Sequence, residues 1–253
     1  MSDSKLQRGF RIDKMIDKTD NFTTKKGNNL FDLSFRLLLI ARSGQGKSSI
    51  LGNLLLKKNG YRNDFEPEKI FIFSGSLKGD AKLKTITEEL DVPDENLFDG
   101  YDDDMISVVY DMLVEDFCEL VDDGETRPKK LNSLIIFDDL AFTDAFKSQS
   151  KENMIKKIFM NGRKFNISVI VISQKYTSVG TILRENMTGL MIGQSSGKQL
   201  ASLEADHNYL KTKKEFIEIY RKATNEPFGM FVINFSKPQL YFNKNFKPLI
   251  KDF

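Results

Sequence analysis

The sequence is poor in the residues that form disulfides and histidine metal sites. It has one cysteine, Cys118, and one histidine, His207, among 253 residues. A single cysteine excludes an intramolecular disulfide and a multi-cysteine zinc site, and a single histidine excludes a metal site built from a histidine cluster. Any catalysis must therefore come from carboxylates, lysine, arginine, hydroxyls or backbone amides.

Long apolar runs are also missing. The longest, such as residues 37–41 and 134–137, are far shorter than the ~20 residues that a helix needs to cross a bilayer. The first four residues are polar and show no apolar segment of the kind found in secretion signals. We therefore expect a protein that has no membrane partner and is not secreted.

The charged residues are segregated, although the net charge is only +2. Residues 147–184 carry eight basic residues against one acid, and residues 211–251 carry nine against three. Segregated basic surface suits a polyanion such as nucleic acid, and ordinary solvated lysines are the alternative. Residues 99–125 contain eleven acids and no Lys or Arg. Their apolar residues recur at helical spacing, which predicts an amphipathic helix with a solvated face. A docking surface for a basic partner is the alternative there.

Short apolar runs alternate with longer amphipathic stretches. The apolar runs are 35–41, 69–74, 133–137, 167–173 and 189–192, and the amphipathic stretches are 47–59, 103–121, 153–164 and 197–203. This alternation predicts an α/β three-layer sandwich with a mainly parallel central sheet. Residues 231–235 and 239–242 flank Ser236-Lys237-Pro238 and predict a C-terminal antiparallel hairpin. We expect an N-terminal arm or edge element over residues 1–32 and one domain over residues 33–253.

The strongest motif is a strand, a glycine-containing loop and a helix in direct succession. The strand at 35–41 runs into Arg42-Ser43-Gly44-Gln45-Gly46-Lys47-Ser48-Ser49. This is the Walker A arrangement of P-loop NTPases, with Ala41 in place of the usual first glycine. Such a loop turns its backbone N–H groups toward phosphates, and the helix adds the positive end of its dipole. Residues 43–49 are therefore the predicted ATP-binding loop, in which Lys47 reaches the β- and γ-phosphates.

A second motif is the apolar run at 134–137, which ends in Asp138 and Asp139. In a parallel sheet, ligands collect at the carboxyl ends of the strands. We expect Ser48 and Asp138 to hold Mg²⁺, and Asp139 to activate the attacking water. The run at 69–74 lies between the two motifs in the chain. We interpret it as the extra strand of the large P-loop division that uses a carboxylate-activated water.

Three further residues are candidates for the chemistry. Gln174 ends the strand at 167–173. If that strand lies beside the Walker A strand, Gln174 faces the γ-phosphate and can sense it or position the water. Arg163 and Arg184 are candidates for an arginine that stabilises the transferring phosphoryl group of a neighbouring subunit. Either arginine could instead be a surface or ion-pairing residue.

The order of these motifs resembles a known group. It is similar to the genome-packaging ATPases of DNA viruses, of the poxvirus and virophage type, within the FtsK/HerA superfamily. The segments that carry the likeness are residues 41–49, residues 135–139, Asn161-Gly162-Arg163-Lys164 with residues 167–174, and Leu183-Arg184-Glu185-Asn186. The resemblance covers roughly residues 33–195. The superfamily more often has Asp-Glu where this chain has Asp138-Asp139.

The resemblance implies a ring-forming motor that hydrolyses ATP with Mg²⁺ and drives double-stranded DNA into a preformed capsid. The partners it implies are DNA, further copies of the chain in a pentamer or hexamer, and viral capsid proteins. It places the protein in the host cytoplasm or viral factory, or with the virion. The polar stretch at 143–153 is long enough to face a DNA channel.

Two other hypotheses stay open. A P-loop kinase of a small molecule would use the same phosphate loop, although the sequence shows no compact arginine cluster for a lid. A nucleotide-gated assembly module with little turnover is the other hypothesis, because the short Asp139 carboxylate could position water poorly. ATP hydrolysis measured with and without double-stranded DNA would separate the three.

Overall fold

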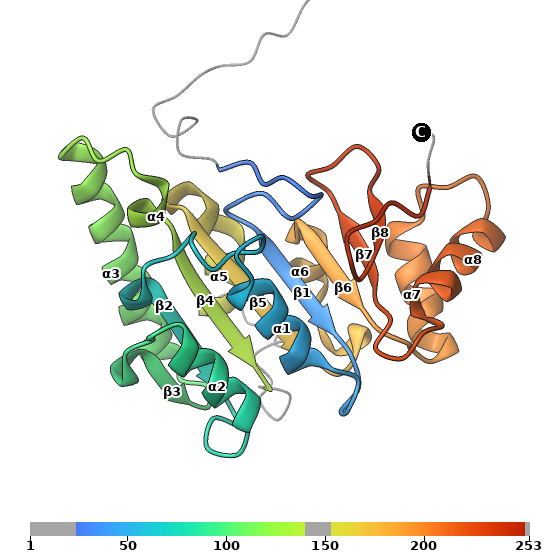
Figure 1. The fold of residues 1–253 in the computed structure, drawn as a ribbon, viewed down its shortest axis with the longest axis horizontal. Helices are drawn as coiled ribbons and strands as arrows, with labels where there is room; N and C mark the ends of the chain where they lie inside the picture. The colour runs from blue at the N-terminus through green and yellow to red at the C-terminus, as the bar shows by residue number, and fades with distance from the viewer. Residues whose placement is uncertain (1–23, 140–152, 251–253) are drawn as a thin grey trace, which may run out of the picture.

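The computed structural model describes residues 24–139 and 153–250. Most of the predicted N-terminal arm, and all but the last residue of the polar stretch expected to face a channel, lie outside these ranges. Within them, one sheet of eight strands runs in the order β3-β2-β4-β5-β1-β6-β7-β8 (Figure 1). The strands are β1 (Arg36–Ile40), β2 (Ile70–Ser74), β3 (Leu97–Asp99), β4 (Ser133–Asp138), β5 (Ile167–Ser173), β6 (Gly189–Ile192), β7 (Phe231–Asn234) and β8 (Tyr241–Asn243).

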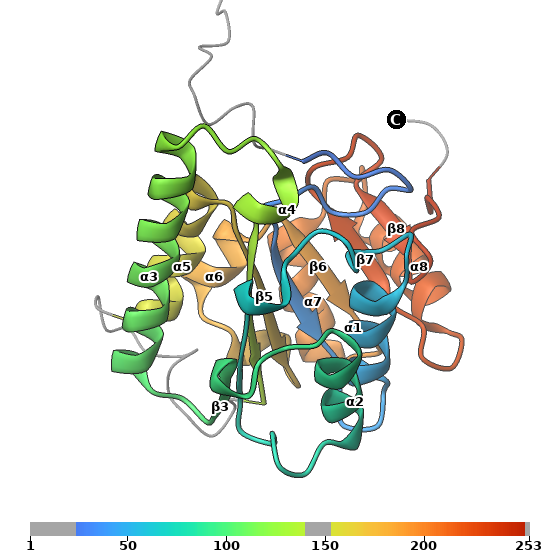
Figure 2. The same ribbon diagram turned by 60° about the vertical axis from the view of Figure 1, so that its left-hand side comes forward.

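Helices cover both faces of this sheet. They are α1 (Lys47–Leu56), α2 (Ala81–Glu89), α3 (Asp103–Asp122), α4 (Pro128–Leu131), α5 (Met154–Asn161), α6 (Thr181–Asn186), α7 (Gly197–His207) and α8 (Lys213–Thr224). Figure 2 shows α1 and α2 on one side of the sheet and α3 and α5 on the other. No helix in the described ranges is long and apolar enough to span a membrane.

The two faces of the sheet bury separate apolar clusters. Along β1, Leu38 and Ile40 pack into the cluster that includes α3, α5 and α8, while Leu37 and Leu39 pack into the cluster beneath α1 and α2. Successive side chains of a strand point to opposite faces. The continuous apolar runs therefore reflect strands that are buried on both sides, and the predicted three-layer sandwich is confirmed.

The sheet order corrects one interpretation. The strand between the Walker A strand β1 and the acidic strand β4 is β5, which pairs in parallel with both. The strand at 69–74 is β2, and it pairs with β4 on the side away from β1. Order along the chain does not determine order in the sheet, because the chain forms β2, β3 and β4 before it returns to the centre. The predicted antiparallel hairpin is present as β7 and β8.

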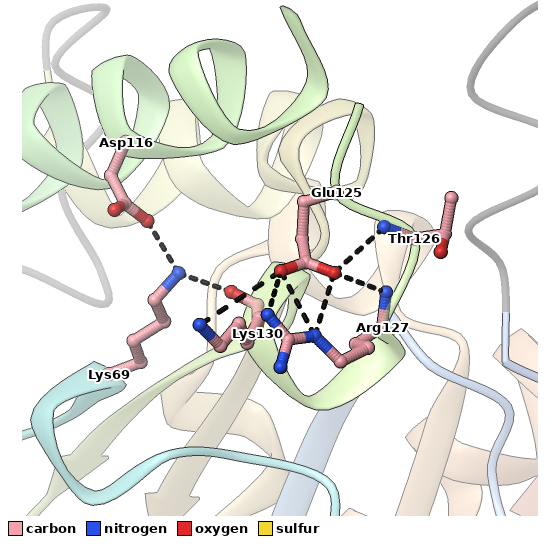
Figure 3. A network of polar contacts seen from close by, with 6 residues as sticks. All are labelled: Lys69, Asp116, Glu125, Thr126, Arg127 and Lys130. Atoms are coloured by element: carbon pink, nitrogen blue, oxygen red, sulfur yellow. Dashed lines mark hydrogen bonds and ion pairs between the residues drawn. The ribbon is translucent and has the colours of Figure 1, made fainter. Parts of the chain in front are cut away.

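The acidic segment forms α3, as its apolar spacing predicts, and basic residues neutralise its C-terminal part (Figure 3). The Lys69 ammonium lies 2.6 Å from the Asp116 carboxylate and also donates to the Lys130 carbonyl. Beyond α3, the Glu125 carboxylate accepts hydrogen bonds from the Arg127 guanidinium and from the backbone N–H of Arg127 and Thr126. These bonds lower the pKa of Glu125 to about 2, and the side-chain hydrogen bond from Arg127 has the largest effect. Part of the acidic run is therefore paired within the chain.

Candidate active site

The carboxyl ends of β1, β4 and β5 meet at one edge of the sheet, beside the start of α1. A cavity of about 850 Å³ opens there. Nine of the predicted site residues line it: Ser43, Gly44, Gly46, Lys47, Ser48, Ser49, Asp138, Asp139 and Gln174. Segments far apart in the chain therefore bring their polar side chains to one place.

The loop before α1 is shaped by two glycines and one glutamine. Gly44 and Gly46 have φ of +77° and +84°, in the left-handed region that glycine adopts most readily. The Gln45 side-chain oxygen accepts from the Arg42 N–H at 3.1 Å, and the Gln45 N–H donates to the Arg42 carbonyl at 3.2 Å. Gln45 thus closes the loop without lining the cavity. At the start of α1, Gly46 provides no side-chain cap and no acid lies in the first turn. The first N–H groups of α1 are therefore available to an anion.

Lys47 and Ser48 begin α1 and face the cavity. The Lys47 ammonium donates to the Arg42 carbonyl at 3.4 Å, a long bond that a phosphate can replace. The Ser48 hydroxyl donates to the Asp80 carboxylate at 2.9 Å. Asp80 also caps α2 by accepting from the N–H groups of Lys82 and Leu83.

Asp80 is a site residue that sequence patterns did not reveal. An aspartate just before a helical stretch is a recognisable N-cap signal, and α2 begins at the next residue. The sequence carries no signal that this cap would lie beside Ser48.

The two carboxylates after β4 differ in their surroundings. Asp138 is buried, and the residue is 7% exposed. Its pKa is raised to about 6, mainly by burial. The nearby charges of Asp139 and Asp80 add to this shift, and the charge of Lys47 opposes it. Asp139 is half-buried, has a φ of +48°, and accepts from the Gln174 amide at 3.4 Å. Because β5 pairs with β1, Gln174 does reach the edge of the sheet where Lys47 lies.

The two candidate arginines lie outside this cavity. Arg163 is exposed in the 3₁₀ turn Gly162–Phe165 before β5, so it lies at the amino end of that strand. The pKa of Arg36, at the amino end of β1, is lowered by burial and then by the Arg163 charge. Arg163 is therefore at the opposite edge of the sheet from Lys47.

Arg184 lies on α6 in an intramolecular network. Its guanidinium pairs with the Asp206 carboxylate and lies 5.0 Å from the centre of the Tyr176 ring. The Tyr176 hydroxyl donates to Asp206 at 2.7 Å and lies 2.8 Å from the His207 ring nitrogen Nε2. Arg184 and His207 line a smaller cavity of about 390 Å³ that is separate from the one at Lys47.

A three-layer sandwich with an additional strand between the phosphate-loop strand and the acidic strand defines a P-loop NTPase fold. Solved structures are similar to it. One is the genome packaging NTPase B204 from Sulfolobus turreted icosahedral virus 2 in complex with AMP, with a TM-score of 0.55 and 10% identity over 80% of this chain and 93% of that chain. Another is B204, the DNA-packaging ATPase from Sulfolobus turreted icosahedral virus, with a TM-score of 0.53 and 14% identity over 81% and 94% of the two chains.

The family model described as poxvirus A32 protein matches residues 101–237. That segment is more than half of the chain, and the chain belongs to this family. The match includes β4 and β5 and leaves the phosphate loop outside, so the loop and the family are independent observations. No curated protein matches the chain.

Proposed function

We propose that this protein is an ATP-hydrolysing motor that moves double-stranded DNA into a viral capsid. The observation that carries the proposal is the single cavity shared by Lys47, Ser48, Asp138, Asp139 and Gln174. Family membership and the likeness of the fold to packaging NTPases support the same conclusion. The motor would act as a ring of five or six copies and engage capsid proteins, in the host cytoplasm, the viral factory or the virion.

The loop N–H groups and Lys47 would bind the triphosphate, because the lysine has only a long bond to give up. The oxygen donors Ser48 and Asp138 suit Mg²⁺, which prefers hydroxyl and carboxylate ligands. Among the described residues, no three His, Cys, Asp or Glu side chains form a metal-binding group. Nucleotide and water oxygens would therefore complete the shell. When bound, Mg²⁺ would neutralise charge on the β- and γ-phosphates.

Two residues next to the γ-phosphate would act on the attacking water molecule. Asp139 would accept the proton of the attacking water, and Gln174, which donates to Asp139, would orient that water. Asp138 must be ionised to hold a cation, so its raised pKa predicts weaker Mg²⁺-nucleotide binding below about pH 6. A bound cation would oppose this shift and favour the ionised form.

An arginine from a neighbouring copy would complete the site. We favour Arg163 for this role, because its guanidinium is exposed while that of Arg184 is paired with Asp206. Its position at the far edge of the sheet prevents it from acting within its own subunit. Hydrolysis would then depend on ring assembly.

The test is ATP hydrolysis with and without double-stranded DNA, with Lys47→Ala as the inactive control. We expect DNA to stimulate turnover by about tenfold or more. Phosphate transfer to a small molecule would instead indicate a kinase, and tight ATP binding without turnover would indicate an assembly module. Either result would overturn the proposal. For the arginine, mixtures of Arg163→Ala and Asp139→Asn subunits should recover activity that each variant lacks, and no recovery at any ratio would exclude Arg163.

A further inference from the structure

An exposed aromatic side chain lies in the cavity at a point that the phosphate chemistry does not use. Phe228 lies between α8 and β7, and the residue is 60% exposed. It lines the same cavity as Lys47 and Asp138. Most of the other described phenylalanines are buried in the core.

The backbone holds Phe228 in an unusual conformation. The Gly229 N–H donates to the Glu226 carbonyl at 2.8 Å, which closes a four-residue turn with Pro227 second and Phe228 third. Phe228 has a φ of +57°, where the third residue of such a turn is normally glycine or asparagine. A bulky residue with positive φ is an outlier, and such outliers cluster at functional sites.

Two neighbours hold this turn in place. A Cβ on Gly229 would lie 2.7 Å from the Ala223 carbonyl oxygen, so the turn packs directly on the end of α8. The Lys244 ammonium donates to the Pro227 carbonyl at 3.2 Å and lies 3.6 Å from the Glu226 carboxylate. The position of Phe228 is therefore determined by bonds of the turn and not by burial of its ring.

The ring lies against the phosphate loop. Its Cδ1 atom is 3.0 Å from where a Cβ on Gly46 would be, so the ring occupies the space that the absent side chain leaves. Lys244, Asn245 and Phe246 continue the cavity wall away from the acidic strand. A volume of about 850 Å³ is near the upper end of the ~300–1,000 Å³ typical of small-molecule sites. The cavity has room for more than the phosphates of a nucleotide.

We infer that Phe228 is the stacking surface for the base of the bound nucleotide. The inference rests on the proposed nucleotide site and assigns its base-binding end, with the phosphates at Lys47 and the base over the exposed ring. Every nucleobase presents a π-face, so stacking supplies affinity without selecting the base. Base identity would depend on hydrogen bonds from polar neighbours such as Asn245, whose amide both donates and accepts.

The experiment compares two ligands that share phosphates and differ in the base: AMPPCP and inorganic tripolyphosphate, each titrated by calorimetry with Mg²⁺. The variant is Phe228→Gly, because glycine suits the positive φ and preserves the turn. We expect it to weaken the binding of AMPPCP about 5- to 100-fold, the range of base–aromatic stacking. The affinity for tripolyphosphate should stay unchanged within about twofold. Phe228→Trp should retain AMPPCP affinity. Met160→Ala removes an exposed apolar side chain of α5 outside the cavity. This control should leave the affinity for both ligands unchanged.

Equal weakening of both ligands by Phe228→Gly would show that Phe228 only supports the phosphate loop, and no change for either would show that the base lies elsewhere. Each result overturns the inference and leaves the proposed ATPase intact. If the wild-type protein binds neither ligand, the nucleotide site itself is wrong. If wild type binds both without turnover, the motor proposal fails while the base-stacking prediction is still decided by the variant.

Discussion

Two polar clusters of this molecule contain similar side chains and differ in how well those side chains are bonded within the chain. In the cavity at the carboxyl edge of the sheet, Lys47 donates to a carbonyl at 3.4 Å and Gln174 donates to Asp139 at 3.4 Å. In the cluster between α6 and α7, Tyr176 donates to Asp206 at 2.7 Å and Arg184 pairs with the same carboxylate. Lys47 and Gln174 in the first cluster have long, replaceable bonds, although Ser48 donates to Asp80 at 2.9 Å there, and the second cluster has short ones.

The difference separates groups that can bind a ligand from groups that hold the fold. A long, solvent-facing bond costs little to exchange for a ligand, whereas breaking a short, partly buried bond leaves a charge or donor without a partner. His207 belongs to the second cluster. Burial lowers its pKa to about 4 and keeps the ring neutral near pH 7. The sequence marks Lys47 and Arg184 alike as candidate catalytic cations, and their bonding distinguishes them.

The largest effect that this comparison predicts is on activity. Lys47→Ala should reduce ATP hydrolysis at least about 100-fold, since removing a preorganised charge at the phosphates costs roughly 3–4 kcal/mol of transition-state stabilisation. The free energy of unfolding should change by less than about 1 kcal/mol, because Lys47 makes one long hydrogen bond within the chain, although its charge favours the ionised Asp138. Steady-state hydrolysis and urea denaturation of the same preparation measure both. Undiminished activity would remove the nucleotide site from consideration.

The opposite effect is predicted for the second cluster. Arg184→Ala should lower the free energy of unfolding by about 2–3 kcal/mol, because it leaves the Asp206 carboxylate with the Tyr176 hydroxyl but without its cation, and removes the cation packed on Tyr176. This figure lies below that of a fully buried pair, since the two side chains are 19% and 34% exposed. Urea denaturation provides the measurement.

A control for that variant is Lys214→Ala. Lys214 pairs with Glu218 on the surface of α8, where the two side chains are 86% and 62% exposed, so we expect urea denaturation to show little or no loss of stability. If Arg184→Ala were as stable as wild type but inactive in an assembled ring, Arg184 would be the arginine acting between subunits and not a residue that holds the fold.

Much of the fold follows from sequence patterns that depend on local physics. The strands at 167–173 and 189–192 have the predicted bounds, because short apolar runs between polar segments define a buried strand. The helix expected at 47–59 ends at Leu56, where Lys57 adopts extended backbone. Five elements, α2, β3, α4, α6 and α8, were not predicted from the sequence. The strand β3 has only three residues, and α2 and α8 are rich in charged side chains that obscure their apolar spacing.

The parts of the site that could not be predicted depend on contacts between distant segments. The Walker A pattern locates Lys47 because the loop and helix that form it are contiguous in sequence. The contact of Ser48 with Asp80 joins residues 32 apart, and Phe228 reaches Gly46 from the far end of the chain. Such contacts are set by the sheet order, in which β5 separates β1 from β4, and no spacing in the sequence specifies that order.

The smallest predicted effect concerns Asp138, which lies in the cavity with Lys47. Its surroundings in the folded protein disfavour the charged form of its carboxylate. Its folded-state pKa of about 6 is above the usual 3.8 because burial and neighbouring carboxylates disfavour the charge. The folded state therefore holds this proton more tightly than the unfolded state does, and wild type loses stability as pH rises from about 4 to about 6. Asp138→Asn does not titrate, so without ligand it should be more stable by about 1–2 kcal/mol above pH 7 and equal to wild type below pH 4.

Urea denaturation across this pH range measures the difference, with Asp111→Asn on the exposed surface of α3 as the control that should show no such trend. Adding AMPPCP and Mg²⁺ sharpens the test. A ligand that binds only the folded state stabilises in proportion to its affinity, so wild type should gain stability and the variant, which lacks a carboxylate for the metal, should gain less. An Asp138→Asn protein that is less stable than wild type at every pH would show that the carboxylate supports the fold, and Asp138 would then belong with Arg184 and not with Lys47.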